Sequence, residues 1–172
     1  LSARQVYEID PFYEIELFEK GLNEDNVEHF LLDPKIDLLV EETDNLKLKI
    51  EIRKKARENK IPVIMVTGNG ENVIIDIERF DTDPSLPILN GYLKDEIIES
   101  IKDEEGFKKL PLTDKILLAR DFMGKEHLTE RLQESFLLVA KELAGIPQIA
   151  ESSFLRGAAI CYCARLIAME AD

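Results

Sequence analysis

The segment IDLLVEETDN, from Ile36 to Asn45, constrains the fold more than any other part of the chain. It joins a continuous apolar run, Leu38 to Val40, to a turn that is rich in carboxylates. An apolar run without alternation is typical of a strand that is buried on both faces of a parallel sheet. Ligands of open α/β sheets bind at the carboxyl ends of such strands. The segment therefore predicts an α/β fold and a candidate functional residue, Asp44, at the end of the strand.

The composition excludes two classes of function. The 172 residues are 45% hydrophobic and 33% charged, as in globular proteins, and their net charge is −13. Because phosphate binding needs clustered Lys and Arg, this charge argues against a nucleic-acid-binding surface. The most apolar stretch, Phe154 to Met169, carries Arg156 and Arg165, so we expect no membrane span.

The cysteines and histidines predict no metal cluster. Cys161 and Cys163 lie in one apolar run, where we expect both to be buried, and a C-x-C pair alone cannot complete a tetrahedral zinc site. His29 and His127 lie in unrelated segments, and neither is predicted to be a general base. Two thiols without a disulfide framework suit a reducing cytoplasm. The chain begins with Leu1 and not Met, so we expect a processed product or a fragment of a longer protein.

The first ninety residues alternate between helix and strand patterns. The predicted elements are a helix at Ser2–Ile9, an edge strand at Tyr13–Phe18, a helix at Asn23–Leu32, strand Ile36–Glu41, helix Asn45–Asn59, strand Ile61–Val66 and return strand Val73–Ile77. Asn69-Gly70 between the last two strands indicates a hairpin. We therefore expect an α/β domain over residues 1–90, with a partial Rossmann-like, mostly parallel sheet and an antiparallel hairpin edge.

Residues 91–172 predict an all-helical C-terminal region. The predicted helices cover Asp95–Asp103, Thr113 to about Met123, Thr129 to the stop signal at Gly145-Ile146-Pro147, and a last helix capped by Ser152 or Ser153. The last helix is apolar almost all round. We therefore expect it to lie in the core or in a subunit interface.

Three segments of the first ninety residues follow a pattern that is known from one family. They are Asp10-Pro11 ahead of a strand, Asp37-Leu38-Leu39-Val40 running into Thr43-Asp44-Asn45, and Lys60-Ile61-Pro62-Val63-Ile64 after a basic helix. These segments resemble the ThiF/MoeB superfamily, the adenylating fold of ubiquitin-activating enzymes, which usually has Asn-Pro where this chain has Asp-Pro. The run GIPQIA at residues 145–150 is similar to the tail of a bacterial ThiF-like subgroup of large proteins.

The resemblance implies ATP-dependent adenylation of a carboxylate, such as the C-terminus of a ubiquitin-like or sulfur-carrier protein, by a homodimer. The family aspartate that matches Asp44 helps to hold Mg²⁺ and the nucleotide phosphates, and Thr43 and Asn45 flank it in the same cofactor-binding turn. A hard cation offsets the charge that develops in such a reaction. The family's Gly-rich phosphate loop and its basic phosphate ligands precede the part that this chain matches. We therefore expect this chain alone to be inactive and to bind ATP poorly.

Other interpretations of the same residues stay open. Asp44 can also be the N-cap of the following helix, a role that is compatible with ligand binding. Glu41 and Glu42 are interpreted as surface residues at the strand end, and the six cations between Lys47 and Arg57 as a solvated helix face. No residue is predicted to be catalytic. The alternative function is a non-catalytic binding or dimerisation module, whereas a nicotinamide or flavin oxidoreductase is disfavoured because the chain has no G-x-G-x-x-G motif.

Overall fold

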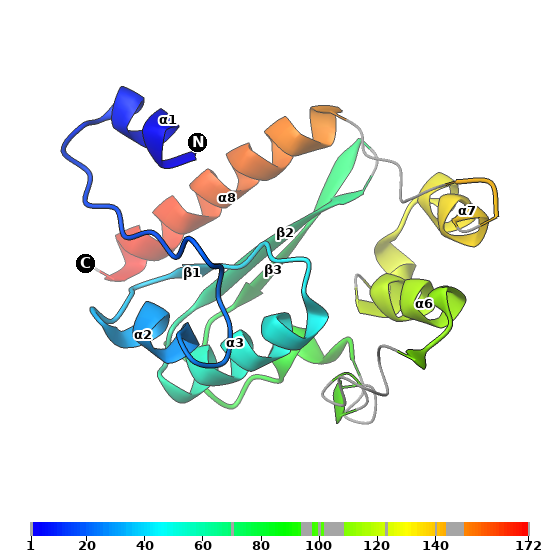
Figure 1. The fold of residues 1–172 in the computed structure, drawn as a ribbon, viewed down its shortest axis with the longest axis horizontal. Helices are drawn as coiled ribbons and strands as arrows, with labels where there is room; N and C mark the ends of the chain where they lie inside the picture. The colour runs from blue at the N-terminus through cyan, green and yellow to red at the C-terminus, as the bar shows by residue number, and fades with distance from the viewer. Residues whose placement is uncertain are drawn as a thin grey trace.

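A short mixed sheet with helices on both faces organises the chain (Figure 1). The computed structural model describes residues 2–69, 71–93, 98–99, 101, 109–122, 124–139, 141–143 and 150–171. Its elements are, in order, α1 (Ser2–Ile9), α2 (Val27–Leu32), β1 (Leu39–Val40), α3 (Leu46–Glu58), β2 (Val63–Asn69), β3 (Asn72–Glu78), the 3₁₀ turn η1 (Ile88–Gly91), α6 (Leu112–Phe122), the 3₁₀ turn η2 (Lys125–His127), α7 (Glu130–Leu138) and α8 (Ala150–Ala171). Among the residues described, none of the helices has the length and apolarity that crossing a bilayer requires.

The strands follow the order β1-β2-β3. β1 pairs with β2 in parallel, with Leu39 opposite Val63. β2 pairs with β3 in antiparallel fashion from Val63 opposite Glu78 to Asn69 opposite Asn72, which confirms the predicted hairpin. In the described residues the sheet is therefore mixed and not mostly parallel, because the antiparallel pair is much longer than the parallel one. The helix α3 connects the two parallel strands as a β-α-β unit.

The predicted edge strand between Tyr13 and Phe18 does not form. The apolar residues of this segment do not line a buried sheet face, since Tyr13 and Leu17 are exposed. The segment is attached to α2 instead: the ring of Phe18 meets that of Phe30 edge to face at 5.5 Å. Alternation of apolar and acidic residues was therefore a misleading strand signal here.

Several helix starts differ from the predictions. α2 begins at Val27 because Asn23 forms an Asx turn, in which its Oδ1 accepts a hydrogen bond from Asp25 N at 2.9 Å. Thr129 caps α7 as predicted, with its Oγ1 accepting from Leu132 N at 3.3 Å. Three other predicted caps, Thr113, Ser152 and Ser153, lie inside helices. α7 already ends at Leu138, and the stop signal at residues 145–147 and most of the predicted helix 95–103 lie outside the described residues.

The two faces of β2 pack against different layers. Ile64 and Val66 face α8, where they contact Cys163 and Ile167 (Figure 1). Val63 and Met65 alternate with them and pack toward α2, α3 and η1. The last helix thus shares a core with the sheet of the first ninety residues.

The outer side of α8 is exposed and apolar. Phe154 has 82% of its surface exposed and Tyr162 has 65%. Cys163 is buried against the sheet, but Cys161 is exposed, so the expectation of two buried thiols was wrong for Cys161. The reason is geometric, since residues two apart on a helix point to nearly opposite sides.

Candidate functional site at the end of strand β1

The loop between β1 and α3 carries Thr43, Asp44 and Asn45, the residues predicted to bind a cofactor. Asn45 is the N-cap of α3, because its Oδ1 accepts a hydrogen bond from Leu48 N at 3.1 Å. The Oγ1 of Thr43 accepts a second one from Asn45 N at 3.2 Å. The capping role considered for Asp44 therefore belongs to its neighbour, and Asp44 lies exposed between two anchored residues.

The buried carboxylate of Glu41 anchors this loop. Its Oε1 accepts a hydrogen bond from Thr43 N at 2.7 Å, and its Oε2 accepts from Lys49 Nζ at 2.7 Å and from Arg53 Nη1. The prediction that Glu41 is a surface residue was wrong, since only 3% of it is exposed. A buried charge of this kind needs both ionic and hydrogen-bonding partners, and Glu41 has both.

Arg53 joins this carboxylate to β3. It is fully buried, and its Nε donates to Glu78 Oε2 at 2.8 Å. Its Nη1 also donates to Lys49 O at 3.1 Å, and its Nη2 lies 3.3 Å from Met65 Sδ. We call Glu41, Lys49, Arg53 and Glu78 the buried ion cluster. The interpretation of the basic stretch as a solvated face was wrong for its two buried members, whereas Lys47 and Lys55 do pair with acidic residues at the surface.

The second oxygen of Glu78 fixes a strained turn. Its Oε1 accepts a hydrogen bond from Leu89 N at 2.6 Å, and Asp76 Oδ1 accepts from Asn90 Nδ2 at 3.3 Å. Leu89 and Asn90 have φ angles of 54° and 50°, in the left-handed region that non-glycine residues rarely adopt. Such strain persists only where the surroundings hold it in place. Here the bonds to two buried carboxylates and the burial of the Leu89 side chain do so.

Carboxylates outnumber cations around the buried ion cluster, because Glu42 and Asp76 adjoin it. Burial raises the pKa of Glu78, Asp76 and Glu42 above their usual values, since a carboxylate that leaves water disfavours its charged form. Burial also lowers the pKa of Lys49, although the charge of Glu41 opposes this. The carboxyl end of β1 therefore lies in a region of excess negative charge, which attracts cations.

The described residues provide no preformed cage for a metal ion, since nowhere among them do three His, Cys, Asp or Glu side chains converge as ligands. Asp44 alone suits a Mg²⁺ that takes its other ligands from water and phosphate, the usual arrangement for this ion. The donor set at the loop fits Mg²⁺ only in the presence of a phosphate ligand.

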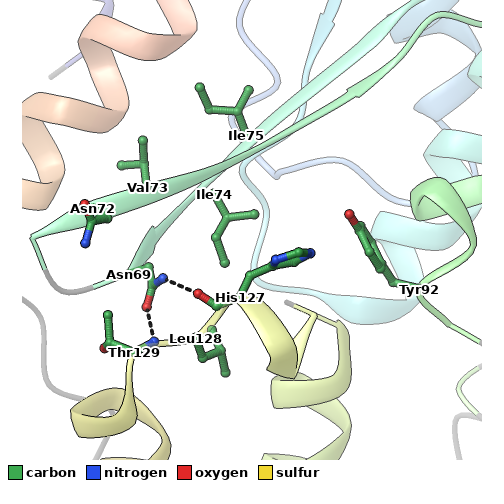
Figure 2. A pocket seen from close by; sticks show the side chains of 9 residues that line it. All are labelled: Asn69, Asn72, Val73, Ile74, Ile75, Tyr92, His127, Leu128 and Thr129. Carbon is green, nitrogen blue, oxygen red and sulfur yellow. Dashed lines mark hydrogen bonds between the residues drawn. The ribbon is translucent and has the colours of Figure 1, made fainter.

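A separate hollow of about 470 Å³ lies beside β3, at the hairpin end of the sheet (Figure 2). Asn69 links β2 to the segment from His127 to Thr129, because its Nδ2 donates to His127 O at 2.7 Å and its Oδ1 accepts from Thr129 N at 3.1 Å. The His127 ring meets that of Tyr92 edge to face at 5.8 Å. None of the residues that line this hollow belongs to the β1–α3 loop. The hollow and the loop are thus different sites.

The other histidine lies on the surface. The side chain of His29 is about half exposed, and its Nε2 lies 3.0 Å from Glu16 Oε1 and its Nδ1 3.4 Å from Asp33 Oδ2. The two histidines come from distant parts of the described fold.

The chain is 29% identical over 169 residues to a protein described as uncharacterized protein MT1398 from Mycobacterium tuberculosis (strain CDC 1551 / Oshkosh). The match covers 98% of this chain and 22% of that relative, so the chain spans about a fifth of the length of the relative. No protein-family model matches the chain, and no solved structure matches it.

Proposed function

We propose that this chain is part of a ThiF-like adenylating protein that uses ATP and Mg²⁺ to activate a carboxylate. The observation that supports this most is the position of Asp44, exposed between the anchored Thr43 and Asn45 at the carboxyl end of a parallel strand. Ligands of α/β sheets bind at this place. The proposal includes a Rossmann-like sheet whose other strands, with a Gly-rich ATP loop, come from outside this chain.

In this proposal the Asp44 carboxylate is a Mg²⁺ ligand, and Thr43 and Asn45 hold it in position. The acceptor is the C-terminal carboxylate of a ubiquitin-like or sulfur-carrier protein. One of its oxygens bonds to the α-phosphorus of ATP, and pyrophosphate leaves. Mg²⁺ offsets the negative charge that builds up on the phosphate oxygens. The proposal assigns the protein to the cytoplasm, which suits the free thiols of Cys161 and Cys163.

The test is ATP–pyrophosphate exchange by the full-length protein with candidate acceptor proteins. We expect Asp44→Asn to lower the exchange rate by about a hundredfold or more, because one charged metal ligand is lost. Asp33→Asn is the matched control, since Asp33 is also exposed but lies after α2, and it should leave the rate unchanged. Undiminished exchange by Asp44→Asn would refute the role of this residue.

A second test concerns the isolated chain. Because the basic phosphate ligands of the family lie outside it, titration calorimetry of the 172-residue chain with Mg-ATP should give much weaker binding than the full-length protein. Equally tight binding by the two proteins would contradict the idea that the missing part supplies most of the nucleotide site.

The second candidate function is a non-catalytic binding or dimerisation module. The outer side of α8 favours it, because Phe154, Tyr162 and Met169 form an exposed apolar row on one helix. Sedimentation of the double variant Phe154→Ser/Tyr162→Ser separates the two candidates. A module of this kind would lose its self-association and show no exchange activity before or after the change, whereas an adenylating homodimer would show exchange.

A further inference from the structure

The outer edge of β3 is an open edge of the sheet, since β2 lies on one side of β3 and no described strand lies on the other. Ile64 O accepts a hydrogen bond from Glu41 N at 2.9 Å, so the backbone groups of Ile64 point toward β1 and away from β3. The register partner of Ile64 in β3 is Ile77. In an antiparallel pair the backbone groups of two opposite residues either face each other or both face away. The N–H and C=O of Ile77 therefore point out of the sheet, and the alternation along a strand gives Ile75 and Val73 the same direction.

These outward backbone groups are unpaired in the part of the chain that the structure describes. Within it, no residue forms a hydrogen bond with the outward N–H or C=O of Val73, Ile75 or Ile77. Proteins usually protect such an edge with a lysine, a proline or a bulge. The outward positions of β3 instead carry only Val and Ile, its pairing with β2 runs without a bulge, and 44% of Ile75 is exposed. An edge of this kind is a template for a further strand.

The hollow beside β3 gives this edge room for such a strand. Its lining includes residues 72–75 of β3 and, across from them, Tyr92 and His127 (Figure 2). Side chains of an added strand would alternate between the two faces of the sheet. Those opposite Ile74 and Asp76 would lie on the face where Tyr92 and His127 stand. Those opposite the outward positions would lie on the α8 face.

The charges around the edge select a basic occupant. Asp76 accepts a single hydrogen bond from the described residues, from Asn90 Nδ2 at 3.3 Å, although only 5% of Asp76 is exposed. A cation opposite Asp76 in an added strand would be close enough to pair with it, because the Cβ atoms of opposite residues are about 5 Å apart. Glu71 and Glu126, which adjoin residues of the hollow, are exposed. A second copy of this chain would bring its own net charge of −13, whereas a basic segment is attracted.

We propose that the outer edge of β3 binds an extended basic peptide of a partner protein by strand addition, with apolar and cationic residues alternating along the peptide. The backbone of the peptide pairs with the outward groups of β3, which supplies affinity, and its alternate side chains supply specificity. The apolar residues pack beside Val73 and Ile75, and the cationic ones lie beside Ile74 and Asp76. This inference does not depend on the proposed function, because none of the residues that line the hollow belongs to the β1–α3 loop.

The test titrates the 172-residue chain with a nine-residue peptide of alternating Lys and Val, acetylated and amidated at its ends, and follows ¹H–¹⁵N NMR signals. We expect shifts of the amide signals of residues 73–77 and slower hydrogen exchange of Ile75 N–H in the complex. A peptide of alternating Glu and Val is the matched control, and its Kd should be about tenfold higher or more. Equal binding of the two peptides would overturn the basic occupant.

Peptides with methylated backbone nitrogens test strand addition without any change to the protein. When the valines pair with β3, their N–H groups face it and the N–H groups of the lysines face away. Methylation of the valine nitrogens should therefore abolish binding, whereas methylation of the lysine nitrogens should leave the Kd unchanged. Equal effects of the two modifications would refute pairing through the backbone.

A proline variant tests the same edge from the side of the protein. Ile75→Pro removes an outward N–H and leaves the bonds between β2 and β3 in place, so it should raise the Kd of the Lys/Val peptide by about tenfold. Val40→Pro is the matched control at the opposite edge of the sheet. The N–H of Val40 faces away from β2, because the flanking Leu39 N and Glu41 N donate to Pro62 O and Ile64 O. This control should leave the Kd unchanged, and the opposite ranking of the two variants would contradict the site.

Two further measurements identify other occupants. Self-association of the chain without peptide, lost in Ile75→Pro, would show by sedimentation that a second copy pairs with β3. Slow hydrogen exchange of residues 73–77 in the full-length protein without peptide would show that a strand of the same protein does so. Either result, or the absence of binding by the Lys/Val peptide, would overturn the proposal.

Discussion

The two faces of the β2–β3 hairpin are stabilised in different ways. On the α3 side, Arg53 of the helix bonds to Glu78 of β3, whereas on the α8 side Ile64 and Val66 lie in a cluster of apolar side chains with Cys163 and Ile167. Apolar burial is non-directional, so it stabilises the hairpin without choosing one strand register. A slip of β3 by one residue would move Glu78 to the opposite face and leave Arg53 without this partner. We infer that the charged face fixes the register and the apolar face supplies burial.

The largest expected effect comes from removing the central cation. Arg53→Met should lower the free energy of unfolding by about 3–5 kcal/mol, because it leaves the buried carboxylate of Glu78 without a cation and that of Glu41 with Lys49 alone. Urea denaturation at neutral pH measures this. The loss should shrink in acid, since burial raises the pKa of Glu78 and protonation then removes its unpaired charge.

The matching control replaces Arg53 together with its two carboxylate partners and keeps Lys49. Glu41→Gln/Arg53→Met/Glu78→Gln removes the unpaired charges together with the cation, so it should recover much of the stability lost in Arg53→Met. Hydrogen exchange should nevertheless show weaker protection in β3, because the register is no longer held. If the triple variant kept full protection, the charged face would not set the register.

The apolar face should respond differently. Ile64→Ala creates a cavity under α8 and should cost roughly 3 kcal/mol. This loss should be the same at pH 5 and pH 8, because the side chains that pack against Ile64 carry no charge over this range. A strongly pH-dependent loss would show that the two faces are energetically coupled and not separate.

In the loop at the end of β1, a structural role and the proposed functional role belong to adjacent residues. Asn45→Ala removes the N-cap of α3 and should cost about 1 kcal/mol of stability. Asp44→Ala removes an exposed side chain and should leave stability within about 0.5 kcal/mol. Thermal unfolding of the two variants measures the difference. Equal losses would mean that Asp44 has a structural role beside its proposed function.

The smallest expected effect is a gain in stability. Burial raises the pKa of Asp76 above 3.8, so its contribution to stability is lost as the pH rises from that value through the pKa of the folded state. Asp76→Asn removes this buried charge and should raise the unfolding temperature at pH 7. The gain should shrink as the pH falls through the raised pKa of Asp76, because the native carboxyl then takes up its proton. Asp83→Asn, at a fully exposed residue, is the control and should show no such gain.

The sequence predicted α1, α3, the start of α7 and the hairpin because their signals are local. Asn45 caps α3 and Thr129 caps α7 through side chains three residues from the donor, and Asn69-Gly70 lies between two apolar runs. The faces of β3 could not be predicted in this way. Alternation predicts that Ile75 is buried and Asp76 exposed, yet 44% of Ile75 is exposed and only 5% of Asp76. Asp76 and Glu78 are buried because their hydrogen-bond partners, Asn90 and Arg53, lie far away in the sequence. A local sequence pattern cannot predict such partners.

One signal for the buried ion cluster is nevertheless present in the sequence. Leu46, Lys49, Ile50 and Arg53 follow the i, i+3, i+4, i+7 spacing of a helix face that packs on a core. Two cations within such a stripe indicate that they have buried partners of opposite charge. The acidic residues at the ends of the predicted strands are the candidates for these partners. By contrast, nothing in the sequence distinguishes Asp44 from Asn45 as the cap, since both residue types are good caps.

The left-handed turn at Leu89 and Asn90 has a consequence for the evolution of this chain. Its shape depends on a relay that runs from Leu89 through Glu78 and Arg53 to Glu41. A substitution at any one of these positions leaves the other buried polar groups without a partner. We therefore expect that these positions change together during evolution. Relatives of this chain should therefore show correlated replacement of Arg53 with its two carboxylate partners, which an alignment of many such sequences would reveal.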